Sequence, residues 1–541
     1  MRQIVQGFTN LTFSRTFSSR NCRYEIRPHF PDEHAVATGA TITPRPRAPA
    51  PALRYEESVS ARSTAHPSAS APTAGSGPLR IIVVGAGAAG SLVVFHLARL
   101  AAGSAGNSNT AGSGGDRPSV DVTVVDPLDP VSGPAFGTAD AAHLLNVPAS
   151  GMSVVPGERF DFVTWCVDEG LTSPDDATYF FAPRNRWARY LRTRLDEARA
   201  AAGDRLRVTH VRSTATGISV DASGVRVTTA DGSAVVGDRL VLATGLPGVG
   251  DGWSPCDLSD QLRYVGDPWR PGALDEVLAD DGDVLVIGTG LTMVDVAISL
   301  LRSGADRRVE AISRNGRLPR RHADRYLGEV VPDIATWGES LDEIRAAVAT
   351  HVARVERLLG NWRPGVDGVR YRVAELWGRL GHDDRALFVR ELAGRWGIHR
   401  HRMPPSNGVL VDEARAAGRL VIRAGRITGV EPGPDGITIR TADDVRTHSW
   451  VVNCTGPQSD LRRLGNPVLD SLFANGLART DALGLGLLTD GGQVLDADGR
   501  PGPIWALGSL RRGELWETTA VPEIREQARD VAESLLDDGR R

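Results

Sequence analysis

The stretch LRIIVVGAGAAGSLVVFHLARLA, residues 79–101, decides the fold of this chain. An apolar strand runs directly into GAGAAG at 85–90 and then into an amphipathic helix. Gly85 permits a tight turn, Gly87 lets the backbone approach a pyrophosphate, and Gly90 lets helix and strand pack closely. The order of strand, glycine turn and helix therefore predicts a dinucleotide-binding fold.

The same motif predicts which residues hold the dinucleotide. The start of the helix offers free amides and a partial positive charge to the phosphates. Asp126 closes the next strand, VDVTVVD at 120–126, where a carboxylate accepts hydrogen bonds from the ribose. Its distance from the glycines exceeds the usual spacing of about 20 residues, and the Gly- and Ser-rich segment 103–117 accounts for the excess as a surface insertion. The candidate cofactor-binding residues of this unit are Gly85, Ala86, Gly87, Ala88, Ala89, Gly90 and Asp126.

A second unit of the same kind begins with the strand DVLVIG at 283–288. Gly288, Thr289 and Gly290 keep the turn and the approach to phosphate, but Met293 stands where the third glycine belongs. The bulkier residue implies looser helix–strand packing or a less deeply seated pyrophosphate. We expect a nicotinamide dinucleotide here, and the alternative is a fold that has kept its shape but not its ligand.

Arg314 ends the second strand of this unit, at the position where NAD-selective folds carry an acid. An arginine there suits the 2′-phosphate of NADP, so the sequence favours NADPH over NADH. The alternative is a role in solubility, because all 62 basic side chains of the chain are Arg.

Composition argues against several classes of protein. The net charge of -4 gives no general affinity for nucleic acids or membranes, and no apolar run approaches the roughly 20 residues that span a bilayer. Cys22, Cys166, Cys256 and Cys454 are scattered without a C-x-x-C pair, which argues against a metal site, a disulfide scaffold and a dithiol redox centre. We expect a cytoplasmic protein that acts on a small molecule.

Longer motifs resemble those of the FAD/NAD(P)-binding oxidoreductases that include FAD-dependent urate hydroxylases and aspartate N-monooxygenases. The resemblance runs from about 80 to 535. The motifs that carry it are GAGAAG (85–90), GPAFGT (133–138), HLLNVPASGMS (143–153), FAPR (181–184), GTGLTMVD (288–295), SRNGRLPRRH (313–322), RHRMPP (400–405) and LWETTAVPEIREQA (515–528).

The resemblance implies that the first fold binds FAD and that the segment around Asn146 and Met152 lines the flavin. It also implies that residues 515–528 bring a helix N-terminus near the flavin pyrimidine. A helix dipole in that position would stabilise negative charge on the reduced ring. Glu517 and Thr518 would then contact the cofactor, and the alternative for each is an ordinary helix cap.

The expected fold class is α/β, with two Rossmann-like dinucleotide-binding domains in a glutathione-reductase-like arrangement. The expected FAD domain comprises 79–280 and 456–541. Gly245 ends LVLATG (240–245), which resembles motifs at the domain crossings of two-dinucleotide flavoproteins, and that resemblance implies that its backbone passes close to the cofactor. The NAD(P) domain, 281–455, is inserted in the FAD domain and carries a helical insertion at 320–400. Residues 1–78, which lack periodicity and are Pro-, Ala- and Ser-rich from 41 onward, are expected to form a disordered extension.

The chemistry is predicted from the cofactors. A disulfide reductase needs a Cys pair beside the flavin, which this sequence lacks. The resemblance favours a monooxygenase that hydroxylates a small polar substrate with FAD and NADPH (or NADH). In such enzymes the flavin carries the chemistry, so no catalytic side chain is assigned. The alternatives are a flavoprotein dehydrogenase or oxidase without oxygen insertion, and a non-catalytic flavin-binding protein.

A basic cluster follows the helical insertion: His399, Arg400, His401 and Arg402. Arginine suits bidentate recognition of carboxylate or phosphate, so the cluster is a candidate site for an anionic substrate or a cofactor phosphate. The alternative is a structural node of ion pairs. The same two interpretations apply to Arg184.

The assignment of Arg314 predicts a change in coenzyme preference. Arg314→Asp should raise the KM for NADPH much more than the KM for NADH, because the carboxylate repels the 2′-phosphate that only NADPH carries. Steady-state kinetics with both coenzymes measure this, and equal effects on the two would refute the assignment.

Overall fold

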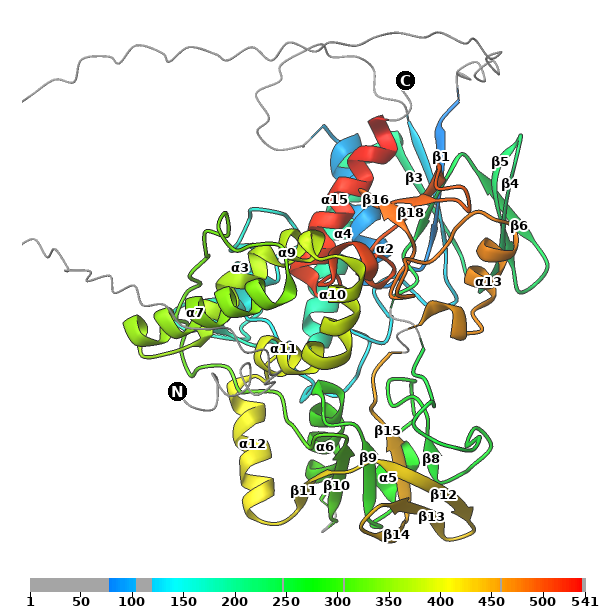
Figure 1. Ribbon diagram of the computed structural model, residues 1–541. Coiled ribbons are helices and arrows are strands. Elements are labelled where there is room, and N and C mark those ends of the chain that lie inside the picture. Colours follow the sequence, from blue (N-terminus) through cyan, green and yellow to red (C-terminus); the bar gives the residue numbers. More distant parts are fainter. Residues whose placement is uncertain (1–76, 104–118, 246–247, 305–306, 458–459, 538–541) are drawn as a thin grey trace, which may run out of the picture. The chain divides into compact units, whose positions relative to one another are not determined.

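The computed structural model describes residues 77–103, 119–245, 248–304, 307–457 and 460–537 (Figure 1). The disordered extension expected over 1–78, except its last two residues, lies outside these ranges, as does most of the insertion expected at 103–117. The described part is built on two mainly parallel sheets, as the predicted fold class requires.

The first sheet has seven strands in the order β16-β17-β18-β7-β1-β2-β3. β1 lies in its middle and pairs in parallel with β2 and β7, while β16 and β17 form an antiparallel edge. β18 returns to this sheet beside β7 after the whole second fold has intervened. The strands are β1 (Leu79–Val84), β2 (Val120–Val125), β3 (Leu206–Val211), β7 (Arg239–Leu242), β16 (Thr489–Asp490), β17 (Gln493–Leu495) and β18 (Pro501–Ala506).

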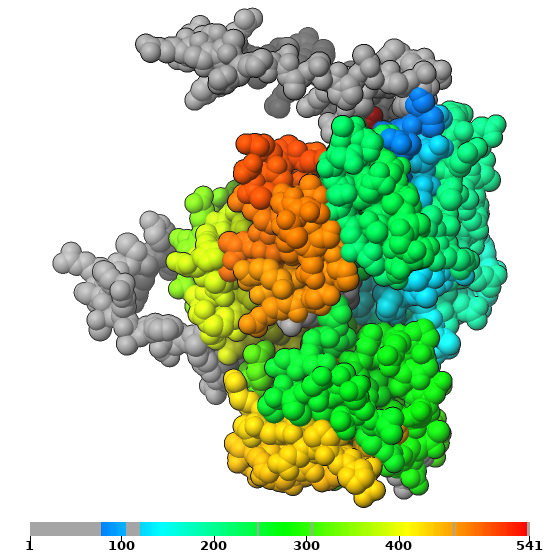
Figure 2. All heavy atoms as spheres, turned by 90° about the vertical axis from the view of Figure 1, so that its right-hand side faces the viewer, coloured from blue at the N-terminus to red at the C-terminus, as the bar shows by residue number. Residues whose placement is uncertain are grey.

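Both faces of the first sheet are covered, which explains why the last four residues of β1, 81–84, are all apolar and buried. Ile81 and Val83 face a core made with helices α2 (Ala88–Ala101), α3 (Asp161–Asp168), α4 (Arg184–Ala202) and α15 (Val521–Asp537). Ile82 and Val84 face the opposite layer. That layer consists of a small antiparallel sheet, β4 (Ala215–Asp221), β5 (Gly224–Thr229) and β6 (Ala234–Gly237), and helix α13 (Pro467–Ala474). Figure 2 shows this outer layer, with the C-terminal residues in orange beside the green β4–β6 sheet.

The second sheet repeats this plan with five parallel strands in the order β11-β10-β9-β15-β8. One face packs on α5 (Asp275–Ala279), α6 (Leu291–Arg302) and α12 (Pro405–Ala416). The other packs on the antiparallel sheet β12 (Ile427–Gly433), β13 (Gly436–Thr441) and β14 (Val445–His448). The parallel strands are β8 (Tyr264–Val265), β9 (Val284–Ile287), β10 (Val309–Ser313), β11 (Leu420–Ala424) and β15 (Trp450–Asn453).

The edge strand β8 corrects one predicted boundary. It pairs with β15 in the second sheet, so the second fold begins before residue 281. A strand of two residues has too little periodicity to be detected in the sequence.

The helical insertion contains five α-helices, which run from 341 to 400. α7 begins with a capping box, in which Ser340 and Glu343 satisfy each other's backbone amides. The core of the insertion includes Trp516 and Leu485 of the C-terminal segment, and the Trp377 and Trp516 rings lie 5.1 Å apart. The insertion, which the sequence assigns to the second fold, therefore also shares a core with the C-terminal segment of the first fold. The helices are α7 (Leu341–Leu359), α8 (Arg363–Val369), α9 (Val373–Arg379), α10 (His382–Leu387) and α11 (Ala393–Arg400).

No helix within the described ranges combines the length and the apolar character that crossing a bilayer demands.

Buried polar contacts join the two folds. Arg184, the first residue of α4, pairs with Asp295 of α6 at 2.5 Å, and the two side chains are 17% and 5% exposed. Nearby, His143 Nε2 lies 2.9 Å from Ser299 Oγ. Burial raises the pKa of Asp295 above its ordinary value, although Arg184 opposes the shift. Arg184 is therefore a structural node, and Asp295 pairs with it across the two folds.

Removing one partner of this pair should destabilise the protein strongly. Asp295→Asn leaves Arg184 as an uncompensated buried charge, which costs about 3 kcal/mol or more in the free energy of unfolding. The exposed pair Arg80–Asp238 is the control, and Asp238→Asn should cost about 1 kcal/mol or less. Urea denaturation of the two variants measures the difference. Equal losses would show that the buried pair has no special role.

Candidate functional site

The first glycine turn has the geometry that a bound pyrophosphate needs. Gly85 has a φ of +107°, and a Cβ there would lie 2.3 Å from the Ala243 carbonyl oxygen at the end of β7. A Cβ on Gly90 would lie 1.9 Å from the Gly85 carbonyl oxygen. A Cβ on Gly87, in contrast, would meet nothing within 4 Å. Gly85 and Gly90 are therefore required by the fold itself, whereas Gly87 faces open space at the start of α2.

The second glycine turn repeats the first in backbone conformation. Gly288 also has a φ of +107°, and its Cβ would lie 2.4 Å from the Cys454 carbonyl oxygen at the end of β15. Gly290 faces open space. Met293, in the place of the third glycine, is fully buried in the core between α6 and its sheet. The helix has to leave room for this side chain, in keeping with the looser packing that its size implies.

The residues predicted beside the glycine turns lie next to them. Asp126 follows β2 directly, and its carboxylate accepts hydrogen bonds from the amides of Ala86 and Leu128, each at 2.7 Å. Thr289 Oγ1 donates to the Arg317 carbonyl oxygen at 2.6 Å, so this hydroxyl already has a partner within the protein. Arg314 follows β10 and is exposed. Contacts of Asp126 with ribose and of Arg314 with a 2′-phosphate stay predictions.

A cavity of about 700 Å³ lies where the first fold meets the helical insertion. One wall is the segment around Asn146 and Gly151, and another is the start of α15 with Pro522. The remaining walls come from the segment 322–329, from α8 and from Arg400 and Arg402, which follow the insertion. The volume is that of an ordinary small-molecule site.

Residues predicted to lie near the flavin divide into two groups at this cavity. Asn146 and Glu517 line it, and their predicted contacts with the flavin stay predictions. Met152 instead packs into the core on the helical face of the first sheet, and its carbonyl oxygen accepts a hydrogen bond from Trp187. Gly245, with a φ of +76°, faces open space at the end of β7.

Several buried polar atoms near the start of α15 have no hydrogen-bond partner among the described residues. They are Thr518 Oγ1, Glu523 Oε2, Arg525 Nε and Gln527 Nε2. An orphaned buried polar group is costly, so such atoms indicate a ligand that completes the site. The residues present thus fit FAD, because Gly87 leaves room for a phosphate and Thr518 offers a hydroxyl without a partner; the contacts of both residues with the cofactor stay predictions.

Glu517 is held by the insertion. Its two carboxylate oxygens accept hydrogen bonds from Trp396 Nε1 at 2.7 Å and from Arg400 Nε at 3.0 Å. Burial alone would raise the pKa of Glu517, but Arg400 and His401 lower it below its ordinary value. Glu517 is therefore an anion that positions the insertion against the start of α15. Of the two interpretations of the basic cluster, Arg400 follows the second, a structural node of ion pairs.

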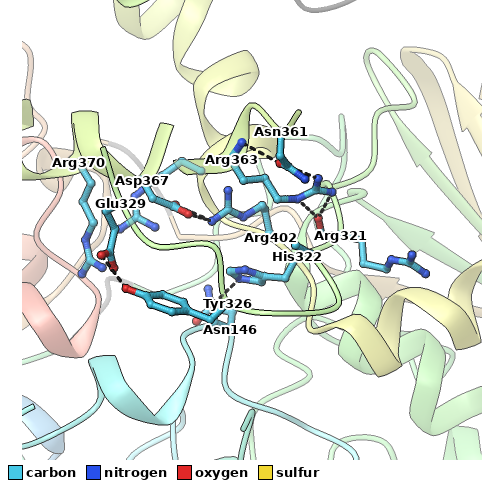
Figure 3. A network of polar contacts seen from close by, with 12 residues as sticks. Asn146, Arg321, His322, Tyr326, Glu329, Asn361, Arg363, Asp367, Arg370 and Arg402 are labelled. Atoms are coloured by element: carbon cyan, nitrogen blue, oxygen red, sulfur yellow. Dashed lines mark hydrogen bonds and ion pairs between the residues drawn. The ribbon is translucent and has the colours of Figure 1, made fainter. Parts of the chain in front are cut away.

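Figure 3 shows the polar network on the side of the cavity that faces the insertion. His322 Nε2 lies 3.0 Å from the Asn146 carbonyl oxygen, and Tyr326 donates to Glu329 at 2.7 Å. Arg402 Nη2 pairs with both carboxylate oxygens of Asp367, at 2.5 and 2.7 Å. Burial, reinforced by Arg402, lowers the pKa of His322 to about 3, so its imidazole is neutral near pH 7.

Sequence reasoning missed several residues of this network. Arg363 and Asp367 of α8, Tyr179 and Arg525 all line the cavity. The first three lie outside every motif that carries the resemblance, whereas Arg525 lies in the motif at 515–528 but was not singled out. Their positions depend on how the insertion packs against the first fold. The charged pair at 363 and 367, with helical spacing on one face, was the available signal, but such pairs occur on any amphipathic helix.

Comparisons with known proteins agree with this fold. A protein-family model described as FAD-NAD(P)-binding matches residues 82–247, the stretch from β1 to the end of β7. Among curated proteins no significant match to the chain is found. The family match confirms the predicted resemblance to FAD/NAD(P)-binding oxidoreductases over this stretch.

Solved structures match most of the chain at low identity. The reduced form of ornithine hydroxylase from Pseudomonas aeruginosa is 15% identical, with a TM-score of 0.56 over 85% of this chain and 99% of that one. Ornithine N-hydroxylase from Kutzneria sp. 744, with reduced FAD, NADP⁺ and L-ornithine, is 16% identical, with a TM-score of 0.52 over 85% and 99%. The FAD-bound cadaverine monooxygenase from Erwinia amylovora is 13% identical, with a TM-score of 0.52 over 84% and 94%. These matches confirm the predicted fold class.

The glycine geometry predicts opposite behaviour of two neighbouring variants. Gly87→Ala should leave thermal stability unchanged, because its Cβ meets open space, but should weaken FAD binding about tenfold or more by intruding on the pyrophosphate. Gly90→Ala should lower stability by about 2 kcal/mol or more, because its Cβ overlaps the backbone of Gly85. Thermal unfolding and FAD titration of the apoprotein measure both. Undiminished FAD affinity in Gly87→Ala would contradict the assigned site.

Proposed function

We propose that this chain is an FAD-dependent, NADPH-linked monooxygenase that hydroxylates a small polar substrate. The observation that carries the proposal is the combination of two glycine turns, each with an open position for a pyrophosphate, and a cavity next to the orphaned polar atoms at the start of α15. One dinucleotide site alone would fit many enzymes. Two, on a fold shared with N-hydroxylating flavoenzymes over most of its length, support electron transfer from a nicotinamide to a flavin.

FAD belongs to the first turn and the nicotinamide coenzyme to the second. The first fold receives the C-terminal helix α15, whose N-terminus lines the cavity through Pro522 and Glu523 and favours negative charge nearby. Bound FAD would supply the redox chemistry. NADPH is favoured over NADH because Arg314 follows β10 and is exposed, and the Kutzneria structure has NADP⁺ bound.

The residues around the cavity bind and orient rather than react. Thr518 and Gln527 offer polar atoms to the flavin, while Asn146 is held by His322. Burial lowers the pKa of His322 to about 3, so its ring is a neutral imidazole near pH 7 whose Nε2 lies within hydrogen-bond distance of the Asn146 carbonyl oxygen. Enclosure of the substrate by the insertion excludes water from the reacting centre. This division of labour accounts for the lack of a recognisable triad or carboxylate pair in the sequence.

The proposal is tested with the purified protein after incubation with FAD. We expect a yellow holoenzyme whose flavin is reduced anaerobically by NADPH more readily than by NADH. On exposure to oxygen with candidate substrates, NADPH consumption should accelerate and a product 16 Da heavier than the substrate should appear in the mass spectrum. Hydrogen peroxide should account for only a minor share of the NADPH consumed.

Other outcomes would overturn the proposal in distinguishable ways. A colourless protein after incubation with FAD would remove the cofactor assignment. A flavin that neither NADPH nor NADH reduces would indicate a non-catalytic flavin-binding protein. Hydrogen peroxide equal to the NADPH consumed, with every substrate tested, would indicate an oxidase without oxygen insertion.

A further inference from the structure

Arg402 is a buried cation with unused hydrogen-bond donors. Its side chain is 2% exposed and lines the cavity. Nη2 pairs with Asp367, but Nε and Nη1 have no hydrogen-bond partner among the described residues. Burial lowers the pKa of Arg402, although a guanidinium remains charged at any pH at which a protein functions. Two charged N–H donors are therefore buried at the cavity without an acceptor.

Arg363 adds a second positive charge beside it. Its Nε and Nη2 both donate to the Arg321 carbonyl oxygen, at 2.9 and 2.6 Å, and Nη1 lies 3.4 Å from Asn361 Oδ1. These partners are neutral, and no carboxylate in the described ranges lies within ion-pair distance of Arg363. Burial and the neighbouring Arg402 lower its pKa. Of these two adjacent cations, Arg402 alone has an ion-pair partner among the described residues, the carboxylate of Asp367 (Figure 3).

The cavity as a whole also has more positively than negatively charged side chains in its walls. Eight arginines and six carboxylates line it, and His322 is neutral. Most of the other arginines have acidic partners: Arg370 and Arg400 face Glu523, and Arg511 faces Glu514. Arg325, which has no ion pair among the described residues, is exposed to solvent, so the buried uncompensated charge is concentrated at Arg402 and Arg363. Buried charge of one sign is costly unless a counter-charge arrives.

We propose that the substrate of this enzyme is an anion whose negatively charged oxygen group binds Arg402 and Arg363. This inference rests on the proposed function and specifies the substrate class of the same cavity. A cationic diamine, such as the substrate named for the Erwinia structure, would be repelled from this wall. The amines of other flavoenzymes with this fold are therefore poor guides to the substrate here.

A carboxylate of the substrate fits this position better than a phosphate of the nicotinamide coenzyme. The coenzyme phosphates have their own site at Gly288, Gly290 and Arg314 on the second fold. Arg402 lies instead beside His322, whose Nε2 is 3.0 Å from the carbonyl oxygen of Asn146 in the segment proposed to line the flavin. On that proposal, the free donors of Arg402 lie on the flavin side of the cavity, where a substrate has to bind.

Titration of the oxidised holoenzyme with small ions tests the proposal, because a ligand near the flavin perturbs its visible spectrum. The probes are succinate, inorganic phosphate and cadaverine. In the wild-type protein succinate should give a saturable change and cadaverine none. Arg402→Gln and Arg363→Gln should each weaken succinate binding about tenfold or more, because each removes a charged donor. Arg207→Gln, on the exposed side of β3, is the matched control and should leave it unchanged.

A variant that is expected to strengthen succinate binding shows whether the losses in the arginine variants could come from misfolding. Asp367→Asn removes the carboxylate that partly neutralises Arg402, so succinate should bind several-fold more tightly, a gain that a damaged protein would not show. The KM for NADPH should change little in all three cavity variants.

The failures of the inference and of the proposed function are distinguishable. A protein that binds FAD and is reduced by NADPH, but whose spectrum responds to cadaverine and not to succinate, would overturn the anionic substrate alone. Phosphate binding lost together with NADPH affinity in Arg402→Gln would assign this wall to the coenzyme and also overturn it. Loss of flavin reduction in the wild-type protein would overturn the proposed function itself.

Discussion

Two backbone contacts that only glycine permits organise both folds. Gly85 lies against the Ala243 carbonyl oxygen and Gly288 against that of Cys454, each with a φ of +107°. In each fold the first strand ends in a glycine that touches the end of its parallel neighbour, β7 beside β1 and β15 beside β9. Any side chain at either glycine would force these strand ends apart. The contact thus fixes the turn at which each dinucleotide is proposed to bind.

The helical insertion creates what the two folds alone would not contain. It packs on Trp516 and Leu485 of the C-terminal segment, and the cavity forms beneath it. Glu517 is held by Trp396 and Arg400 of the insertion, so the start of α15 and the insertion are joined by a buried ion pair. The wall of the proposed substrate site therefore depends on an element that a minimal dinucleotide-binding fold does not require.

Much of this was available from the sequence because the decisive signals are local. A strand, a glycine turn and a helix lie within about 20 consecutive residues, and the spacing of the glycines predicts how tightly the chain turns between strand and helix. The same local logic located Asp126 beside the first turn and Arg314 after β10. The same logic does not reach Met152, which the resemblance alone placed by the flavin; its side chain packs in the core of the first fold, and its contact with the cofactor stays a prediction. Local patterns also missed the two-residue strand β8, since so short a strand has no periodicity.

The sequence by itself determined the fold class, the two glycine turns and the resemblance to FAD/NAD(P)-binding oxidoreductases, because these depend on short-range patterns. Only the tertiary structure decided which arginines are neutralised. Arg184 pairs with Asp295 across the two folds. Arg402 pairs with Asp367 and retains free donors, while Arg363 nearby has only neutral hydrogen-bond partners among the described residues. In a chain whose basic residues are all arginine, composition could not separate these roles. The difference arises from ion-pair partners more than 30 residues away, which only folding brings together.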